Sequence, residues 1–317
     1  MSSDLLAGVS VLDFGTVGPA ARASAILADY GATITKVGAV PRAGAVTITP
    51  PAFAYSGGRG TRRVQLDLKA DKGRAAAQAL AAASDVVIES FRPGVADRLG
   101  IGWNELSTQN PRLVYCSTSG YGQNGPASQR AGHDLNYLAV GGFLDCSGRR
   151  DDGGPALPGA TVADIAAGGM QAAMAIMAAL IGRGNTGEGR YLDVSIVDGV
   201  VAMMSLYVDE YLVTGTEPGP GHNVLTGRYA WYGIYRCADD GWISVGAIEP
   251  RFYANLLREL DLDSERFGSA QYEDEAQDDL RAAMTKVFAT RSRGDWAGQL
   301  GDADCCVAPV MTIPEMT

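Results

Sequence analysis

The first half of the chain alternates short apolar runs with alanine-rich segments. Four runs predict buried strands, at 9–14, 33–37, 85–89 and 113–117. Residues 19–30 and 72–83 have the composition and spacing of helices, and Gly31 follows the first of them as a typical stop signal. Strands that alternate with helices at this spacing predict a mostly parallel sheet covered by helices, which is an α/β fold.

The second half changes character after residue 213. Residues 162–182 predict a long helix, followed by a strand and a further helix up to 213. The next ten residues contain three glycines and two prolines, which is typical of a linker. Beyond it, the pattern predicts a hairpin at 229–247 and then helices near 250–260, 277–290 and 294–300. We therefore expect a large α/β domain over 1–213, a linker over 214–224 and a smaller α+β domain over 225–317.

Composition and charge narrow the class of protein. Apolar residues make up 46% of the 317, which predicts an ordered globular chain. The start has no signal-peptide pattern, we find no apolar run long enough for a membrane span, and the five cysteines have no metal-like spacing. We expect a soluble cytoplasmic protein. The net charge of −10 argues against nucleic-acid binding, although residues 1–130 hold 13 Lys/Arg against 9 Asp/Glu and suit a small polyanion.

Three residues are candidates for proton chemistry. His133 follows a glycine-rich loop, and an imidazole titrates near neutral pH, so it can both take and return a proton. Asp164 lies at the start of the long predicted helix, where neighbouring amides can also stabilise an oxyanion. Glu249 begins a helix of the small domain. Each alone has an ordinary structural explanation, as a hydrogen-bonded histidine or a helix N-terminal acid.

Phosphate-binding candidates are less specific. The loop at 15–19 follows the first strand but matches neither a dinucleotide fingerprint nor a P-loop. Arginine suits phosphate groups because its donors form a planar fork. The arginines in or beside predicted loops of the basic half are Arg59, Arg62, Arg63, Arg92 and Arg98. On their own they are equally consistent with surface arginines.

Taken in order, these and further motifs resemble the class III CoA-transferase (CaiB/BaiF) family from end to end. The matching runs are Leu66-Asp67-Leu68-Lys69, Phe91-Arg92-Pro93-Gly94, Arg98-Leu99-Gly100, Gly120-Tyr121-Gly122-Gln123, Val162-Ala163-Asp164 and Thr186-Gly187-Glu188-Gly189. Two runs, at 132–137 and 245–253, are similar to the α-methylacyl-CoA racemase branch of that family, in which a histidine accompanies the aspartate.

The resemblance implies a Rossmann-like large domain and a set of site residues. His133 and Asp164 would move protons on opposite faces of the carbon next to a thioester, and Glu249 would support His133. Amides at the start of the helix that carries Asp164 would stabilise the enolate oxygen. The implied coenzyme A contacts are Arg59, Leu66, Asp67, Leu68, Lys69, Ser90, Phe91, Arg92, Arg98, Gly132, Asp134, Leu135, Asn136 and Tyr137.

The resemblance also implies partners. Coenzyme A would enter as part of an acyl-CoA substrate, with no permanently bound cofactor. We expect no nucleic-acid partner and no membrane association. We also expect an interlocked homodimer. In the family, a C-terminal segment that returns to the large domain completes this dimer, and we do not find that segment before Thr317. The chain departs from the family at Ala39, where an arginine usually contacts the adenine end of coenzyme A; Arg42 and Arg59 are candidate replacements. It departs again at 226–230, beside the expected acyl pocket.

Three functions follow from these residues. The first is a racemase or epimerase acting on 2-methyl-branched acyl-CoA. The second is a CoA-transferase in which Asp164 acts as a nucleophile, and the third is a CoA-binding homologue that has lost catalysis. The sequence does not distinguish among acyl chains.

Overall fold

The computed structural model describes residues 4–15, 17–41 and 61–317. The chain divides into two compact units. The first comprises Met1–Leu144 with Leu157–Leu212, and the second comprises Asp145–Ala156 with Val213–Thr317. Residues 145–156, which we assigned to the large domain, thus group with the second unit. The predicted linker at 214–224 also lies inside that unit.

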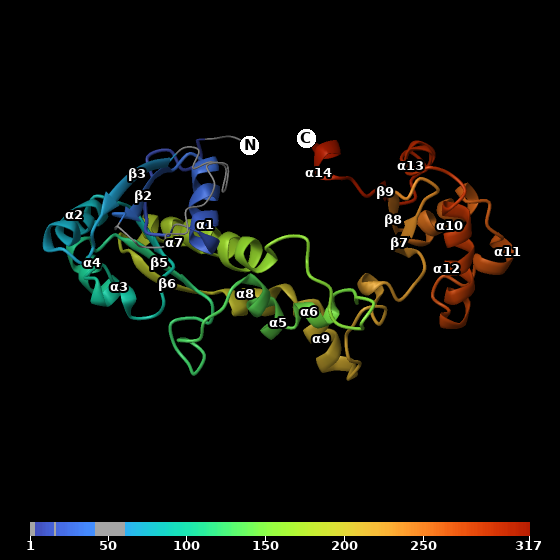
Figure 1. The fold of residues 1–317 in the computed structure, drawn as a ribbon, viewed down its shortest axis with the longest axis horizontal. Helices are drawn as coiled ribbons and strands as arrows, with labels where there is room; N and C mark the ends of the chain where they lie inside the picture. The colour runs from blue at the N-terminus through green and yellow to red at the C-terminus, as the bar shows by residue number, and fades with distance from the viewer. Residues whose placement is uncertain (1–3, 16, 42–60) are drawn as a thin grey trace. The chain divides into compact units, whose positions relative to one another are not determined.

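A six-stranded parallel sheet forms the centre of the first unit (Figure 1). Its strand order is β3-β2-β1-β4-β5-β6. The strands are β1 (Ser10–Asp13), β2 (Thr33–Ala39), β3 (Thr61–Leu66), β4 (Val86–Glu89), β5 (Val114–Ser119) and β6 (Arg190–Ser195). The predicted α/β class with a mostly parallel sheet is therefore confirmed.

Helices cover both faces of this sheet, which explains why its central strands are continuous apolar runs. In β1, Val11 packs with residues of α1 (Gly18–Asp29) and α7 (Gln171–Thr186). Its neighbour Leu12 points to the opposite face, into a cluster that includes residues of α2 (Asp71–Ala82) and α4 (Trp103–Gln109). The same alternation continues along β4 and β5.

The chain runs outward from β1 in one direction through β2 and β3, and then in the other through β4, β5 and β6. Strand order therefore reverses between β1 and β4. In open parallel sheets, ligands bind beyond the carboxyl ends of the strands at such a reversal. The remaining helices in this part of the chain are α3 (Val95–Arg98), α5 (Asp134–Val140), α6 (Phe143–Cys146), the π-helix η2 (Ala163–Met170), α8 (Ile196–Met203) and α9 (Ser205–Thr214).

Glycines allow η2 to pack closely against its neighbours. A Cβ on Gly168 would lie 2.6 Å from the Cβ of Pro19 in α1. A Cβ on Gly199 of α8 would lie 2.3 Å from the carbonyl oxygen of Ala167. Both approaches are closer than real Cβ atoms permit. The sequence therefore places η2 firmly against α1 and α8, and with it the Asp164 side chain in its first turn.

The long predicted helix begins as η2 and continues as α7, so that it runs from Ala163 to Thr186. Contrary to our expectation, this helix is long and apolar enough to cross a membrane by length and composition, with a mean hydropathy of 1.7. Within the fold, 39% of its most apolar stretch is buried. Ala172, Ala173 and Ile176 of α7 belong to the hydrophobic core that packs against the sheet.

The second unit is an α+β structure. An antiparallel sheet pairs β7 (Tyr232–Arg236), β8 (Trp242–Gly246) and β9 (Val307–Pro309), and its first two strands form the predicted hairpin. Trp231, Tyr253 and Phe288 are among the largest side chains buried in its core. Its helices are η3 (Val224–Thr226), α10 (Pro250–Glu259), α11 (Ser264–Phe267), α12 (Asp274–Phe288), α13 (Arg293–Leu300) and α14 (Ile313–Met316).

Candidate active site

A cavity of about 670 Å³ lies in the first unit, where the strand order reverses. Its walls come from the segments that follow β1 and β4, from the end of β5, and from the first turns of α5 and η2. The predicted site residues that line it are Ser90, Phe91, Arg92, Gly132, His133, Asn136, Tyr137 and Asp164. The fold thus brings both predicted proton carriers to one cavity from segments 31 positions apart in the sequence.

Other predicted site residues lie outside this wall. Those in the first unit are Leu66, Asp67, Leu68, Lys69, Arg98, Asp134 and Leu135. Leu66 ends the edge strand β3, Arg98 ends α3, and both are separate from the cavity lining. Glu249 belongs to the second unit, where it occupies the N-cap position of α10. Arg42 and Arg59 lie outside the described residues.

The first turn of α5 fixes the main chain at His133. His133 is the N-cap residue of that helix, and its amide donates to Asn136 Oδ1 at 3.0 Å. The Tyr137 hydroxyl donates to the Gly132 carbonyl oxygen at 2.7 Å. A Cβ on Gly132 would lie 2.6 Å from the Tyr137 ring. A glycine is therefore required beside the histidine, and α5 presents the exposed imidazole to the cavity.

Asp164 is held from two sides. Its amide donates to Asp134 Oδ1 with 2.8 Å between the two atoms, which ties η2 to α5. Its carboxylate faces α1, since a Cβ on Gly18 would lie 3.8 Å from Asp164 Oδ2. Burial raises the pKa of Asp164 above its usual value, and the Asp134 carboxylate raises it further. Arg22 and His133 lower it. A carboxyl whose pKa is raised in this way is better suited to exchange protons near neutral pH.

Three amides near the start of η2, where we predicted support for the enolate oxygen, make hydrogen bonds within the protein. The Asp164 amide is taken by Asp134, and the Ile165 amide donates to the Thr161 carbonyl oxygen at 2.9 Å. The Val162 amide donates to the Ala160 carbonyl oxygen at 3.0 Å. These three donors already have acceptors within the protein, because the chain closes a turn and a carboxylate caps the helix.

Two hydroxyl groups in the cavity wall, unlike these amides, have no hydrogen-bond partner among the described residues. Thr118 and Ser119 line the cavity and are only 1% and 7% exposed. Neither hydroxyl oxygen has a hydrogen-bond partner among the described residues. Leaving a buried hydroxyl unpaired costs about 1–3 kcal/mol. Sequence reasoning missed both residues, because a hydroxyl at the end of an apolar strand has no distinctive pattern.

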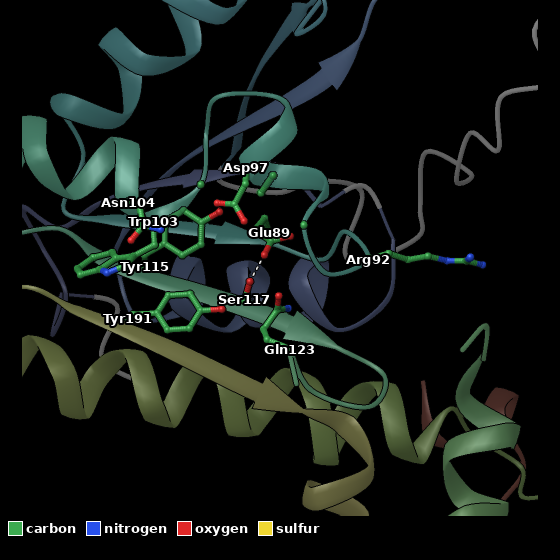
Figure 2. Close-up of a pocket in the computed structure, with 12 residues that line it drawn as sticks. Glu89, Arg92, Asp97, Trp103, Asn104, Tyr115, Ser117, Gln123 and Tyr191 are labelled. Carbon is green, nitrogen blue, oxygen red and sulfur yellow. Dashed lines mark hydrogen bonds between the residues drawn. The ribbon is translucent and has the colours of Figure 1, made fainter. Parts of the chain in front are cut away.

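A smaller cavity of about 190 Å³ lies beside the segment that follows β4 (Figure 2). Glu89 and Ser117 line it from adjacent strands, and their side chains are hydrogen-bonded to each other. Burial raises the pKa of Glu89 to about 7. In the sequence, Glu89 ends a predicted strand. Its position after three apolar residues was the available signal of a buried acid.

The described residues contain no group of three or more His, Cys, Asp or Glu side chains arranged to hold a metal ion. Two arginines, Arg92 and Arg130, line the main cavity. Of these, Arg92 is a predicted coenzyme A contact. Arg62 and Arg63 lie on β3 at the edge of the sheet.

Comparison with known proteins gives a consistent result. The profile described as CoA-transferase family III matches residues 6–317. The chain is 35% identical over 314 residues to human alpha-methylacyl-CoA racemase, covering 98% of this chain and 79% of the relative. It is 34% identical over 265 residues to human succinyl-CoA:glutarate CoA-transferase, covering 81% of this chain and 59% of the relative. A CaiB/BaiF family protein from Brucella suis superposes with a TM-score of 0.84 at 26% identity, covering 99% of this chain and 86% of that structure.

Proposed function

The chain belongs to CoA-transferase family III, and from this premise we propose that it is an acyl-CoA racemase that inverts a 2-methyl-branched carbon next to the thioester. The observation that carries the proposal is that His133 and Asp164 line the same cavity. The similarity to human alpha-methylacyl-CoA racemase over 98% of this chain supports it.

The reaction needs two proton carriers on opposite faces of C2. One side chain removes the C2 proton. The electron pair of the broken C2–H bond moves toward the thioester carbonyl and forms an enolate. The other side chain, which already holds a proton, delivers it to the opposite face and restores the carbonyl. His133 serves one face and Asp164 the other, with their roles exchanged for the opposite enantiomer. Each placed proton carrier contributes a factor on the order of 10²–10⁴ to the rate.

The enolate oxygen needs hydrogen-bond donors while it is negatively charged. The hydroxyls of Thr118 and Ser119 are buried in the cavity wall without partners. Because neither hydroxyl has a partner among the described residues, each can donate a hydrogen bond to the substrate oxygen. We propose that these two hydroxyls serve the enolate oxygen.

The coenzyme A portion of the substrate binds to the segment that follows β4. Ser90, Phe91 and Arg92 line the cavity there. In the proposed complex Arg92 pairs with a phosphate group, and the groove continues past Gly132, Asn136 and Tyr137. Asp67, Lys69 and Arg98 extend it. Coenzyme A enters only as part of the substrate, and no cofactor is bound permanently.

Glu249 belongs to the second unit, and its support of the His133 imidazole stays a prediction. Its place as the N-cap of α10 leaves its carboxylate at the end of a helix rather than within a hydrophobic core.

The functional form is proposed to be a cytoplasmic homodimer not associated with membranes. Several apolar side chains are exposed on α9, and a second copy of the chain would cover them. They are Leu206, Val208, Tyr211 and Leu212.

A CoA-transferase is the second candidate, because the chain is also 34% identical to human succinyl-CoA:glutarate CoA-transferase. In that reaction the Asp164 carboxylate would attack the thioester carbonyl and release coenzyme A as a thiolate, forming a mixed anhydride. The raised pKa of Asp164 does not separate the two functions, since both use the carboxylate.

Hydrogen exchange distinguishes them. We would incubate each enantiomer of a 2-methylacyl-CoA in deuterated water without an acceptor acid and follow C2 deuteration by mass spectrometry. The racemase exchanges the C2 hydrogen and inverts the centre. His133→Gln and Asp164→Asn should each abolish proton removal from a different enantiomer. Absence of exchange, together with CoA transfer to an added carboxylate, would contradict the racemase and support the transferase.

A further inference from the structure

Glu89 links the small cavity to the loop of the main cavity. It is the last residue of β4 and is only 3% exposed. One carboxyl oxygen, Oε1, bonds with the Ser117 hydroxyl of the adjacent strand β5 (Figure 2). The other, Oε2, accepts the Phe91 amide at 2.7 Å. Both oxygens are therefore used in fixing the chain immediately after the strand.

The segment fixed in this way is the one that faces the substrate. Ser90, Phe91, Arg92 and Pro93 all line the main cavity with His133 and Asp164. The described hydrogen bond from the Phe91 amide to Glu89 ties the middle of this segment to the sheet. Any change in that bond is therefore transmitted directly to the Phe91 and Arg92 main chain.

Burial and the neighbouring charges determine the pKa of Glu89. Burial raises its pKa to about 7, the carboxylates of Asp97 and Asp193 raise it as well, and the Phe91 amide lowers it. Tyr115 and Tyr191 line the small cavity with it, and Cys116 on β5 also senses its charge. Arg92 lines the same small cavity, but Figure 2 shows its side chain extending away from the Glu89 carboxylate. Among the described residues, the charged groups that act on the buried Glu89 are the carboxylates of Asp97 and Asp193.

We propose that Glu89 is a positioning residue that holds the Ser90–Pro93 segment in its ligand-binding arrangement through the Phe91 amide, and that its ionisation strengthens coenzyme A binding. The inference rests on the proposed function in so far as that segment binds coenzyme A. It adds a pH-dependent control of affinity at a residue that does not touch the substrate.

The direction of the effect follows from the hydrogen bond. A neutral carboxyl accepts the Phe91 amide weakly, whereas a carboxylate forms a charge-assisted bond of roughly twice the strength. As pH rises through about 7, Glu89 ionises and the segment becomes better ordered. The dissociation constant of coenzyme A should therefore fall by about three- to tenfold between pH 6 and pH 8 beyond any change that the ligand's own phosphates cause.

The test compares the wild-type chain with Glu89→Gln, which keeps the shape and an acceptor but has no charge. Coenzyme A itself is titrated calorimetrically from pH 5.5 to 8.5 with both proteins. The ratio of their dissociation constants should be near one at pH 5.5 and rise to about three- to tenfold at pH 8.5. A ratio that does not change with pH would overturn the proposal.

Asp97→Asn is the matched control, because Asp97 lines the same small cavity and raises the pKa of Glu89. Removing its charge should keep the pH dependence of affinity but move its midpoint to lower pH. Glu89→Gln should remove the midpoint altogether. A purely structural role for Glu89 would lower affinity equally at every pH and would leave the Asp97→Asn curve unshifted.

A second measurement does not depend on coenzyme A. The Phe91 amide proton should titrate with a midpoint near 7 in the NMR spectrum of the ligand-free wild type and should not titrate in Glu89→Gln. A flat Phe91 signal in the wild type would overturn the coupling. If the Phe91 signal titrates but the wild type does not bind coenzyme A, the proposed function is contradicted. The role of Glu89 would then be limited to ordering the Ser90–Pro93 segment.

Discussion

The Asp164 amide donates to the Asp134 carboxylate, with 2.8 Å between nitrogen and Oδ1. This bond joins the first turn of η2 to the first turn of α5, the two helices that carry the proposed proton carriers. The same contact places a negative charge beside the Asp164 side chain, and that charge contributes to its raised pKa. The Asp134 carboxylate therefore holds the main chain of Asp164 and also adds to the raised pKa of its side chain.

Asp134→Asn should separate these two effects. The amide oxygen of asparagine still accepts the Asp164 amide, but the negative charge is lost, so the pKa of Asp164 falls. For the enantiomer deprotonated by Asp164, the acid limb of the kcat/KM profile should move to lower pH. Asp134→Ala, which also loses the hydrogen bond, should reduce kcat by about tenfold or more. An unshifted acid limb in Asp134→Asn would contradict the electrostatic role of Asp134.

Thr118→Val and Ser119→Ala should lower activity without lowering stability. Loss of a donor to an enolate oxygen costs a factor on the order of 10²–10³ in kcat. Each hydroxyl is buried and unpartnered in the free protein, so its removal is neutral or stabilising by about 1 kcal/mol. The measurements are C2 exchange rates and thermal unfolding.

Ser117→Ala is the control for these two variants, because the Ser117 hydroxyl is bonded to Glu89. It should destabilise the protein by about 1–3 kcal/mol, since it removes one partner of a buried pair. If Thr118→Val and Ser119→Ala destabilise the fold to the same extent, then their hydroxyls have partners and the proposed role is wrong.

Glu89→Gln should change how stability depends on pH. The folded-state pKa of Glu89 is raised from 4.5 to about 7, so the folded protein retains a proton that the unfolded chain releases in this interval. The contribution of Glu89 therefore lowers the unfolding free energy as pH rises from about 4.5 to 7. Relative to wild type, Glu89→Gln should gain up to about 3 kcal/mol across that interval. Urea unfolding of both proteins at pH 5 and pH 7.5 measures the difference, and a constant difference would contradict the raised pKa.

Gly199→Ala should displace η2 and reduce activity. The added Cβ would lie 2.3 Å from the Ala167 carbonyl oxygen, so α8 and η2 must separate. Overpacking of this kind costs about 1–3 kcal/mol. Gly182→Ala is the matched control, because nothing lies within 4 Å of its added Cβ in α7. That variant should be stabilised by about 0.5–1 kcal/mol with unchanged exchange rates. Thermal unfolding and C2 exchange check both.

Much of the fold could be predicted because the central strands are buried on both faces. Val11 and Leu12 pack on opposite sides of the sheet, which requires an apolar run that is visible in the sequence. The edge strand β3 was missed, and its second and third residues, Arg62 and Arg63, are exposed. An edge strand has one neighbour and tolerates polar residues, so its pattern resembles a loop. The short strand β9 was missed for the same reason, since it ends at Pro309 at the edge of its sheet.

The sequence alone determined the family resemblance, the α/β class and the choice of His133 and Asp164 as candidates. This was possible because motifs and hydrophobic periodicity depend only on residues that are close together in the sequence. Only the tertiary structure decided that the two share a cavity and that Asp134 occupies the Asp164 amide. It also decided that Thr118, Ser119 and Glu89 are buried. These properties depend on which distant segments meet and on how far water is excluded between them, and no local pattern encodes either.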